Sequence, residues 1–311
     1  MASVASIHRE RTVKKAFIIL AHKNPAQLER LIDALNDGNS TFFIHIDKKS
    51  EASAFRQLAQ RNTHIASVKS VSTNWADFSL VEATLNGMKA VLEHPFQFDF
   101  ISLISGQHYP IKSNEYINDF LRETNCRTFL EFTEIPNYDR WKVRGGLYRL
   151  DKYFLGMRYH ERITAKAMNF ISSYTGFLKR SFPAHMKPYA GSQWWTMDNY
   201  TLRYVMNFVK NNKDFVDYHK RMFAPDELFF HNILLNADDD IVLSGIANNN
   251  LLYMNWPNLD HAHPEMLVAK DIDKIIGSDA LFARKFDIDQ DAFILDLVDE
   301  SRGDKGIADM L

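Results

Sequence analysis

Two adjacent carboxylates, Asp226 and Glu227, stand at the start of an apolar segment and could perform acid–base chemistry. Pro225 precedes them directly, and the spacing of apolar residues from Leu228 to Leu235 predicts a helix that begins at this proline. Acidic side chains in a first helical turn can simply complement the helix dipole. Alternatively, one of them is positioned as a general base. Local spacing leaves both interpretations open.

The first third of the chain alternates short apolar runs with helical patterns. We expect strands at 14–21, 41–47, 68–71 and 99–104, and helices at 26–35 and 79–92. This alternation predicts an α/β fold with a Rossmann-like, mostly parallel central sheet flanked by helices. In such sheets ligands bind beyond the carboxyl ends of the strands, which is where His22, Asp47 and Ser105 fall.

Composition points to a protein that folds without cross-links. At 311 residues with 46% apolar content, the chain can bury a full core. Its single cysteine, Cys126, excludes an internal disulfide and suits a reducing compartment. Residues 1–12 lack the apolar core of a signal peptide, and no later run reaches the roughly 20 apolar residues of a spanning helix. We therefore expect a cytoplasmic protein.

The net charge of −2 conceals a basic belt between Arg140 and Tyr189. This belt contains 11 Lys or Arg residues against only Asp151 and Glu161. Such a surplus predicts an anionic partner, for example phosphates or the inner face of the cell membrane, although a solvated helix surface remains an alternative. The apolar residues from Ile163 to Leu178 fall at helical spacing within the belt. They predict either a helix packed on the domain or a basic amphipathic helix on a membrane.

The common nucleotide, protease and hydrolase motifs are absent. The chain contains no G-x-G-x-x-G, no G-x-x-x-x-G-K-[ST], no H-E-x-x-H and no G-x-S-x-G. D-x-D triplets occur only in the C-terminal part, away from the early strands, and we interpret them as solvated acids rather than metal ligands. They lie at 238–240, 271–273, 287–289 and 289–291.

Several stretches, in the same order along residues 14–299, together resemble one family, the core-2/I-branching β-1,6-N-acetylglucosaminyltransferases with their xylosyltransferase and bacterial relatives. The matching stretches are Phe43-Ile44-His45-Ile46-Asp47-Lys48-Lys49, Phe78 to Asn86, Ser105 to Lys112, Gly191-Ser192-Gln193-Trp194-Trp195, Pro225-Asp226-Glu227 and Leu281 to Asp287. The resemblance implies a GT-A-like fold and an inverting, metal-independent transfer from a UDP-sugar. GlcNAc is the expected sugar, although relatives also use xylose and glucuronic acid. No cofactor is expected beside the UDP-sugar co-substrate.

The same resemblance assigns roles around the reaction. It makes Glu227 the general base, and it leaves Asp226 to orient the loop or cap backbone N–H groups. Lys285 becomes the first diphosphate contact, with Arg284 beside it, because without a metal the leaving group must be neutralised by cations. His263 aligns loosely with a second phosphate-binding arginine. Together with His261 it could alternatively form part of a metal site.

Further positions follow from the resemblance for donor and acceptor. Donor contacts are expected at Ala21, His22, Asp47 and Ser105. Acceptor contacts are expected at Glu131, Arg140, Trp256 and Trp195, with core packing as the alternative for the tryptophans. His108 stands where relatives often carry an acidic residue.

The organisation expected from these assignments is a disordered tail at 1–12 followed by a single GT-A-like domain at 13–311. Within it we predict a nucleotide-binding half at 13–135, a basic helical insertion at 136–190, an acceptor and catalytic half at 191–299, and a tail at 300–311. The expected role is the synthesis of a bacterial surface polysaccharide, with a glycan or lipid-linked saccharide as the acceptor. A carbohydrate-binding or nucleotide-sugar-binding module without turnover is a second possibility. A glycoside hydrolase, which needs two carboxyl groups across the bond, is a third.

Overall fold

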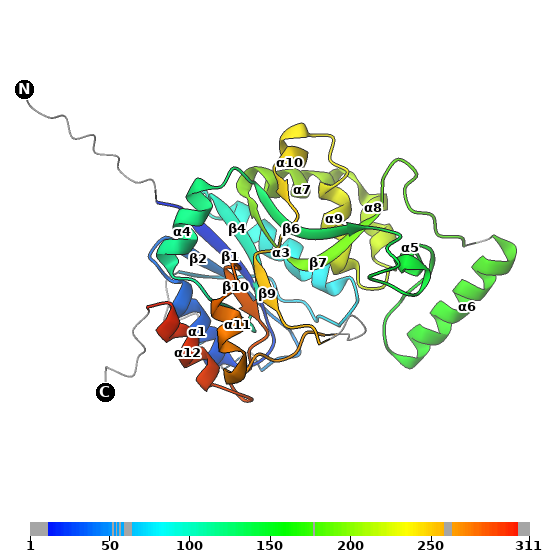
Figure 1. Ribbon diagram of the computed structural model, residues 1–311. Helices are drawn as coiled ribbons and strands as arrows, with labels where there is room; N and C mark the ends of the chain where they lie inside the picture. Colours follow the sequence, from blue (N-terminus) through cyan, green and yellow to red (C-terminus); the bar gives the residue numbers. More distant parts are fainter. Residues whose placement is uncertain are drawn as a thin grey trace, which may run out of the picture.

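A twisted sheet of seven strands forms the centre of the molecule in the computed structural model (Figure 1). The structure describes residues 12–51, 53, 55, 57–58, 64–176, 178–257 and 263–303, so most of the two predicted tails lies outside it. The strand order is β3-β2-β1-β4-β7-β6-β8. The strands are β1 Lys15–Ala21, β2 Ser40–Ile46, β3 Ile65–Ser67, β4 Phe100–Ser105, β6 Thr128–Glu134, β7 Tyr189–Asp198 and β8 Ile246–Ala247. Strands β1 to β4 pair in parallel, β7 runs antiparallel to both neighbours, and β8 is parallel to β6.

Helices cover both faces of this sheet. On one face lie α1 Pro25–Leu35, α4 Asn114–Glu123, α11 Ile272–Ile276 and α12 Phe293–Ser301. On the other lie α3 Ser79–Glu93, α7 Asn199–Asn211, α8 Lys213–His219 and α9 Phe229–Leu234. The predicted class, an α/β fold with a mostly parallel central sheet between helices, is therefore confirmed.

Strand β1 shows why its sequence reads as a continuous apolar run. Phe17 and Ile19 enter the core on the α1 side, whereas Ala16 and Ile18 enter the core on the α3 side. A strand buried on both faces has no polar face to alternate with. Helix α3 approaches so closely that a Cβ on Gly87 would lie 2.4 Å from the Ile18 side chain, and only glycine fits there.

A second sheet of three short strands carries part of the site. Its order is β5-β10-β9, with β5 His108–Pro110, β9 Leu252–Met254 and β10 Phe282–Arg284. The remaining helical elements are α5 Tyr148–Asp151, α6 Tyr159–Thr175, α10 Asp240–Ser244 and the 3-10 helices η1 Arg144–Gly146, η2 Pro225–Glu227 and η3 Ala269–Asp271.

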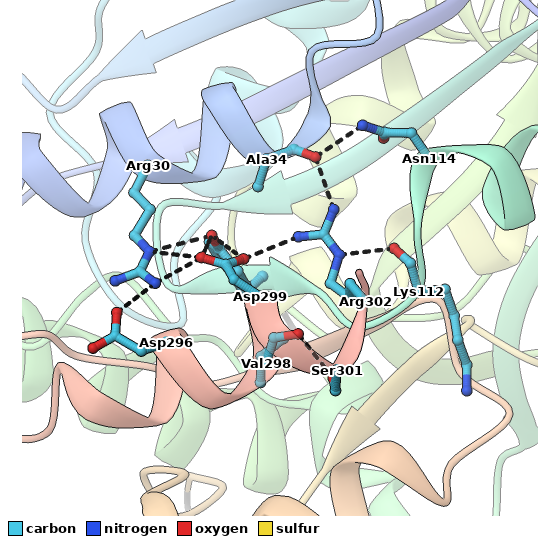
Figure 2. A network of polar contacts seen from close by, with 10 residues as sticks. Arg30, Ala34, Lys112, Asn114, Asp296, Val298, Asp299, Ser301 and Arg302 are labelled. Carbon is cyan, nitrogen blue, oxygen red and sulfur yellow. Dashed lines mark hydrogen bonds and ion pairs between the residues drawn. The ribbon is translucent and has the colours of Figure 1, made fainter. Parts of the chain in front are cut away.

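Charged side chains fasten the C-terminal helix α12 onto α1 (Figure 2). Asp299 accepts hydrogen bonds from Arg30 at 2.6 Å and from the Tyr109 hydroxyl at 2.8 Å. Arg302, which is fully buried, donates to the carbonyl oxygens of Ala34 at 2.9 Å and Lys112 at 3.0 Å. This network holds α12 against α1 in the helical layer on one face of the sheet.

Two sequence-based boundaries need correction. The third strand lies at Ile65–Ser67 rather than 68–71, because its register with β2 pairs Phe42 with Ile65. The helix in the basic belt ends at Thr175, where Gly176 takes a left-handed conformation, so Leu178 lies outside it. Helix α6 stands beside the main body rather than over the sheet (Figure 1). Among the described residues no helix combines the length and apolarity needed to cross a bilayer.

Candidate active site

The carboxyl ends of β1 and β2 meet where a donor is expected. The Asp47 backbone N–H donates to the Ala21 carbonyl at 3.0 Å, which locks the two strand ends together. The Asp47 carboxylate accepts from the backbone N–H groups of Lys49 at 2.8 Å and Thr73 at 3.1 Å, and from the Thr73 hydroxyl. Burial raises the pKa of Asp47, but these hydrogen bonds outweigh it and hold the pKa below its usual value. Asp47 therefore remains ionised and orders the loops around the neighbouring His22.

Two adjacent cations stand at the end of strand β10, with Arg284 as its last residue and Lys285 directly after it. The Arg284 guanidinium lies 4.7 Å from the centre of the Trp194 ring, and its buried Nε has no hydrogen-bond partner. Desolvation lowers the pKa of Arg284 to about 10. Desolvation also lowers the pKa of Lys285, and the charge of Arg284 adds to this effect. No ion pair of Arg284 or Lys285 is present within the described ranges, and a buried cation with an unpartnered N–H favours the binding of an anion here.

A third cation nearby is already neutralised. Lys23 pairs with Asp287, and Asn24 donates to the same carboxylate at 2.7 Å. These contacts tie the end of β1 to the loop after β10. Asp287 is buried, so the interpretation of its D-x-D triplet as solvated acids is wrong at this position.

His263 joins the cation pair to the carboxylate site. Its ring lies 5.6 Å from that of Trp75, which in turn lies 5.7 Å from the Phe223 ring. Desolvation and the charges of Lys285 and Arg284 lower the pKa of His263, whereas the charge of Glu227 opposes this shift. The charges of the cation pair and of Glu227 therefore both act on His263. His261 lies outside the described residues, so a paired histidine metal site is not assessed; within the described ranges no three His, Cys, Asp or Glu side chains converge as metal ligands.

Glu227 ends the 3-10 helix η2 instead of lying within one long helix. Ala224 takes a left-handed conformation and accepts the Glu227 N–H at 3.2 Å, and Leu228 leaves helical geometry before α9 begins. The Glu227 carboxylate is 37% exposed and pairs with Nη2 of the almost fully buried Arg149 at 2.5 Å. Glu227 therefore presents a carboxylate to solvent with an arginine fixed behind it.

Arg149 is the functional residue that sequence reasoning missed. Its guanidinium lies 5.2 Å from the Trp141 ring centre and 5.7 Å from that of Phe223, while Nε and Nη1 are buried without partners. Nothing in the local spacing distinguishes Arg149 from the other cations of the basic belt. The exposed Trp75 was missed as well, because no local pattern marks it as part of a site.

Asp226 has a different environment from Glu227. It is buried, and its Oδ1 has no hydrogen-bond partner. Burial, together with the charge of Glu227, raises the pKa of Asp226 to about 7. The capping role predicted for Asp226 has no support at this oxygen.

The residues expected on the acceptor side lie next to this carboxylate site. Arg140 pairs with Glu131 at 2.5 Å, and its guanidinium lies 5.3 Å from the same Trp141 ring that contacts Arg149. His231 donates through Nε2 to the Glu131 carbonyl at 3.2 Å. A Cβ on Gly191 would lie 1.9 Å from that carbonyl oxygen, so β7 can pass there only as glycine.

The other predicted contacts divide into exposed and buried positions. Trp256 is 43% exposed and follows β9, which pairs with β10. Trp195 is 1% exposed and packs 5.7 Å from the Phe230 ring, so the prediction that it contacts the acceptor is wrong. Ser105 is buried, and its hydroxyl lies 2.9 Å from Nδ1 of the buried His108.

Comparison with known proteins adds the family. Xylosyltransferase 2 of Rattus norvegicus is 28% identical over 255 residues, covering 78% of this chain and 27% of that protein. Xylosyltransferase 1 of Homo sapiens is 26% identical over 254 residues, covering 78% of this chain and 24% of that protein. The chain thus matches about a quarter of the length of these relatives. The structure of mouse xyloside xylosyltransferase 1 aligns with a TM-score of 0.35 and 12% identity, over 87% of this chain and 96% of that one.

The matched residues include the carboxyl ends of β1 and β2 and the segment that carries Glu227. The match includes β1, β2, the Glu131 region and η2, and it ends before β10. Residues 15–276 match the model described as Core-2/I-Branching enzyme, and the chain therefore belongs to this family of glycosyltransferases.

Proposed function

We propose that the protein transfers a sugar from a UDP-sugar to a hydroxyl group of a glycan, with inversion at the anomeric carbon and without a metal ion. One observation carries the proposal. The ring of His263 lies 5.6 Å from that of Trp75, which lies 5.7 Å from that of Phe223, four residues before the partly exposed Glu227. The charges of Arg284, Lys285 and Glu227 all act on this histidine. A base and an anion site this close together match the two ends of a displacement at a sugar carbon.

In the proposed step the acceptor oxygen attacks the anomeric carbon while the bond from that carbon to the UDP oxygen breaks. The proton of the acceptor hydroxyl passes to Glu227, and UDP departs with the bonding electron pair. The leaving group needs no proton, so a second carboxylic acid is unnecessary. Arg149 holds Glu227 by its ion pair and acts as a positioning residue.

Positive side chains take the place of a metal in this proposal. Lys285 and Arg284 neutralise the diphosphate, which supplies the anion that their surroundings lack. Bound phosphate would also raise the pKa of His263 and allow it to protonate beside the leaving group. Asp47 orders the loops that receive the nucleoside.

On the acceptor side, the Glu131–Arg140 pair and the exposed Trp256 offer hydrogen bonds and an apolar surface to a sugar. GlcNAc is the proposed donor sugar. Xylose is the second candidate, because the curated relatives are named xylosyltransferases. The proposed setting is the assembly of a bacterial surface polysaccharide in the cytoplasm.

The test is a panel of UDP-sugars with thermal-shift and donor-hydrolysis readouts, with and without EDTA. We expect UDP-GlcNAc or UDP-xylose to stabilise the protein and to be consumed, with no effect of EDTA. Activity that disappears in EDTA and returns with Mn²⁺ would overturn the metal-free mechanism. Sugar release from a glycan without any nucleotide would favour a hydrolase.

Glu227→Gln tests the base. We expect a loss of about 100-fold to 10,000-fold in turnover, because the proton acceptor is removed, with UDP binding retained. A Glu227→Gln variant with near-native turnover would contradict the role of Glu227. UDP-sugar binding without turnover by the native protein would favour a binding module.

A further inference from the structure

The outward side of helix α6 is apolar and uncovered. Its five large apolar residues are between 40% and 82% exposed, and we call them the outer face: Tyr159, Ile163, Phe170, Ile171 and Tyr174. At about 100° per residue they fall within one arc of about 120°, opposite Ala165, the buried residue of the helix. The amphipathic pattern is therefore real, but its apolar side points away from the protein.

Polar contacts along one flank of α6 attach the helix to the molecule. The Asn169 side chain accepts from the Tyr153 N–H at 2.7 Å and donates to the Tyr153 carbonyl at 3.0 Å. The Ser173 hydroxyl accepts from Lys152 at 3.3 Å. Because these bonds fix the helix, the outer face cannot simply turn inward. Figure 1 shows the helix standing at one side of the body.

Two cations, Lys166 and Arg162, lie along one border of the outer face, and Thr164 and Thr175 lie along the other. Arg162 and Lys166 lie one helical turn apart, are exposed, and form no ion pair in the part of the chain that the structure describes. The acid of the helix, Glu161, is turned the other way and accepts the Arg158 N–H at 2.9 Å. The chain as a whole has a net charge of −2, so this basic and apolar surface contrasts with the remainder.

Four other cations of the basic belt do not extend this surface. Arg140, Arg144 and Arg149 pair with carboxylates, and Arg180 donates to backbone carbonyls. These four cations therefore add no free positive charge to the outer face.

The size of the outer face selects among occupants. A helix of 17 residues presents about 25 Å by 10 Å, or about 250 Å², whereas a stable protein interface buries about 800 Å² per partner. A second copy would also place like charges together. Tyrosine, phenylalanine and isoleucine beside basic residues suit the boundary between headgroups and acyl chains.

We propose that the outer face of α6 docks on an anionic membrane surface, with its apolar residues at headgroup level and with Arg162 and Lys166 on acidic headgroups. This surface is separate from the proposed reaction, because none of its residues belongs to the site around Glu227. The segment with Arg140 and Arg149 leads directly into α6, so docking would hold the acceptor side near the lipid.

The test is co-sedimentation of the full chain with vesicles of phosphatidylcholine alone or mixed with phosphatidylglycerol. We expect binding to the anionic vesicles only, weakened by salt. Arg162→Gln with Lys166→Gln should reduce the partition coefficient about 30-fold, from about 1 kcal/mol per charge near the surface. Phe170→Ser with Tyr174→Ser should reduce it about tenfold or more.

Matched controls remove similar groups elsewhere. Lys210→Gln with Lys213→Gln removes two exposed charges, and Phe293→Ser removes an exposed aromatic ring of α12. These variants should bind like the native chain. Circular dichroism and thermal melting establish that every variant is folded.

Three results would overturn the proposal. The first is equal binding of the native chain to neutral and anionic vesicles, or to neither. The second is a loss of binding in the control variants as large as that in the α6 variants. The third is concentration-dependent dimerisation in sedimentation velocity that Phe170→Ser with Tyr174→Ser abolishes, which would identify the outer face as a contact between copies.

Discussion

Two clusters of arginine in this protein treat charge in opposite ways. Between α1 and α12, the guanidinium of Arg302 is satisfied by two backbone carbonyls and lies 3.4 Å from Asp299 (Figure 2). At the candidate active site, Arg149 and Arg284 keep buried N–H groups without partners. Unpartnered buried N–H groups cost free energy. The first cluster therefore stabilises the fold, whereas the second keeps buried N–H groups unpaired in the folded protein, as the proposed diphosphate site requires.

The same substitution should consequently have opposite effects in the two clusters. Methionine has a length and volume close to those of the arginine stem but cannot donate hydrogen bonds. Where the N–H groups of an arginine have partners, the substitution takes a donor away from those acceptors. Where arginine is unsatisfied, its loss removes a burden on the folded state.

The largest effect is expected for Arg302→Met. It would remove one donor from Asp299, which keeps Arg30 and Tyr109, and one from each of two carbonyl oxygens. The loss of these buried contacts should lower the free energy of unfolding by about 3–5 kcal/mol. Urea denaturation measures this loss. Turnover per folded molecule should remain native, and a stability change below about 1 kcal/mol would contradict the role assigned to the network.

Arg284→Met and Lys285→Met should reverse this pattern. Each should weaken UDP-sugar binding about 10-fold to 100-fold, because a charge-assisted hydrogen bond to phosphate is worth about 1.5–3 kcal/mol. Stability should be unchanged or slightly higher. Isothermal titration calorimetry with UDP measures the affinity, and Lys274→Met, which removes an exposed cation of α11, is the control. Equal losses of affinity in all three variants would show only an effect of net charge.

The sequence predicts the buried strands and helices of the fold better than the short strand at the edge of the sheet. Pattern alone predicts β1, α1 and α3, because β1 is a continuous apolar run buried on both faces and each of the two helices buries one regular face. Strand β3 has three residues and one partner, so its position depends on the register with β2 rather than on its own pattern. A strand at the edge of a sheet carries little local signal.

At the candidate active site, the sequence mainly failed to predict contacts between residues far apart in the chain. Arg149 meets Glu227 across 78 positions, and no local spacing encodes such a contact. The prediction for Trp195 was wrong because helices cover β7. In the sequence, large aromatic residues buried in a strand look the same as aromatic residues exposed for binding a sugar. The resemblance to the family, by contrast, named Arg284 and Lys285 from the sequence. The structure then shows which residues surround them.

Arg149→Met sharpens the comparison within the site. Glu227 would lose the partner that fixes it, so we expect kcat to fall about 10-fold to 100-fold with little change in KM for the donor. The free energy of unfolding should stay within about 1 kcal/mol of native, since two N–H groups of Arg149 have no partner to lose. Steady-state kinetics and urea denaturation on the same preparation measure both quantities. A drop in stability comparable to that of Arg302→Met would place Arg149 with the structural cluster instead.

Asp226→Asn gives the smallest and most pH-dependent effect. Burial and the charge of Glu227 raise the pKa of Asp226 to about 7, whereas an unfolded aspartate titrates near 3.9. Protonated Asp226 therefore contributes stability that is complete below about pH 4 and is lost as the pH rises through about 7. The asparagine variant should lack this loss and should be more stable than the native chain by about 1–3 kcal/mol at pH 8, with little difference near pH 4. Urea denaturation at the two pH values measures it, and Asp299→Asn, the same change in the paired cluster, should instead destabilise at pH 8. If Asp226→Asn were less stable than native at pH 8, the carboxylate would have to be paired, and the contrast between the two clusters would not extend to their acids.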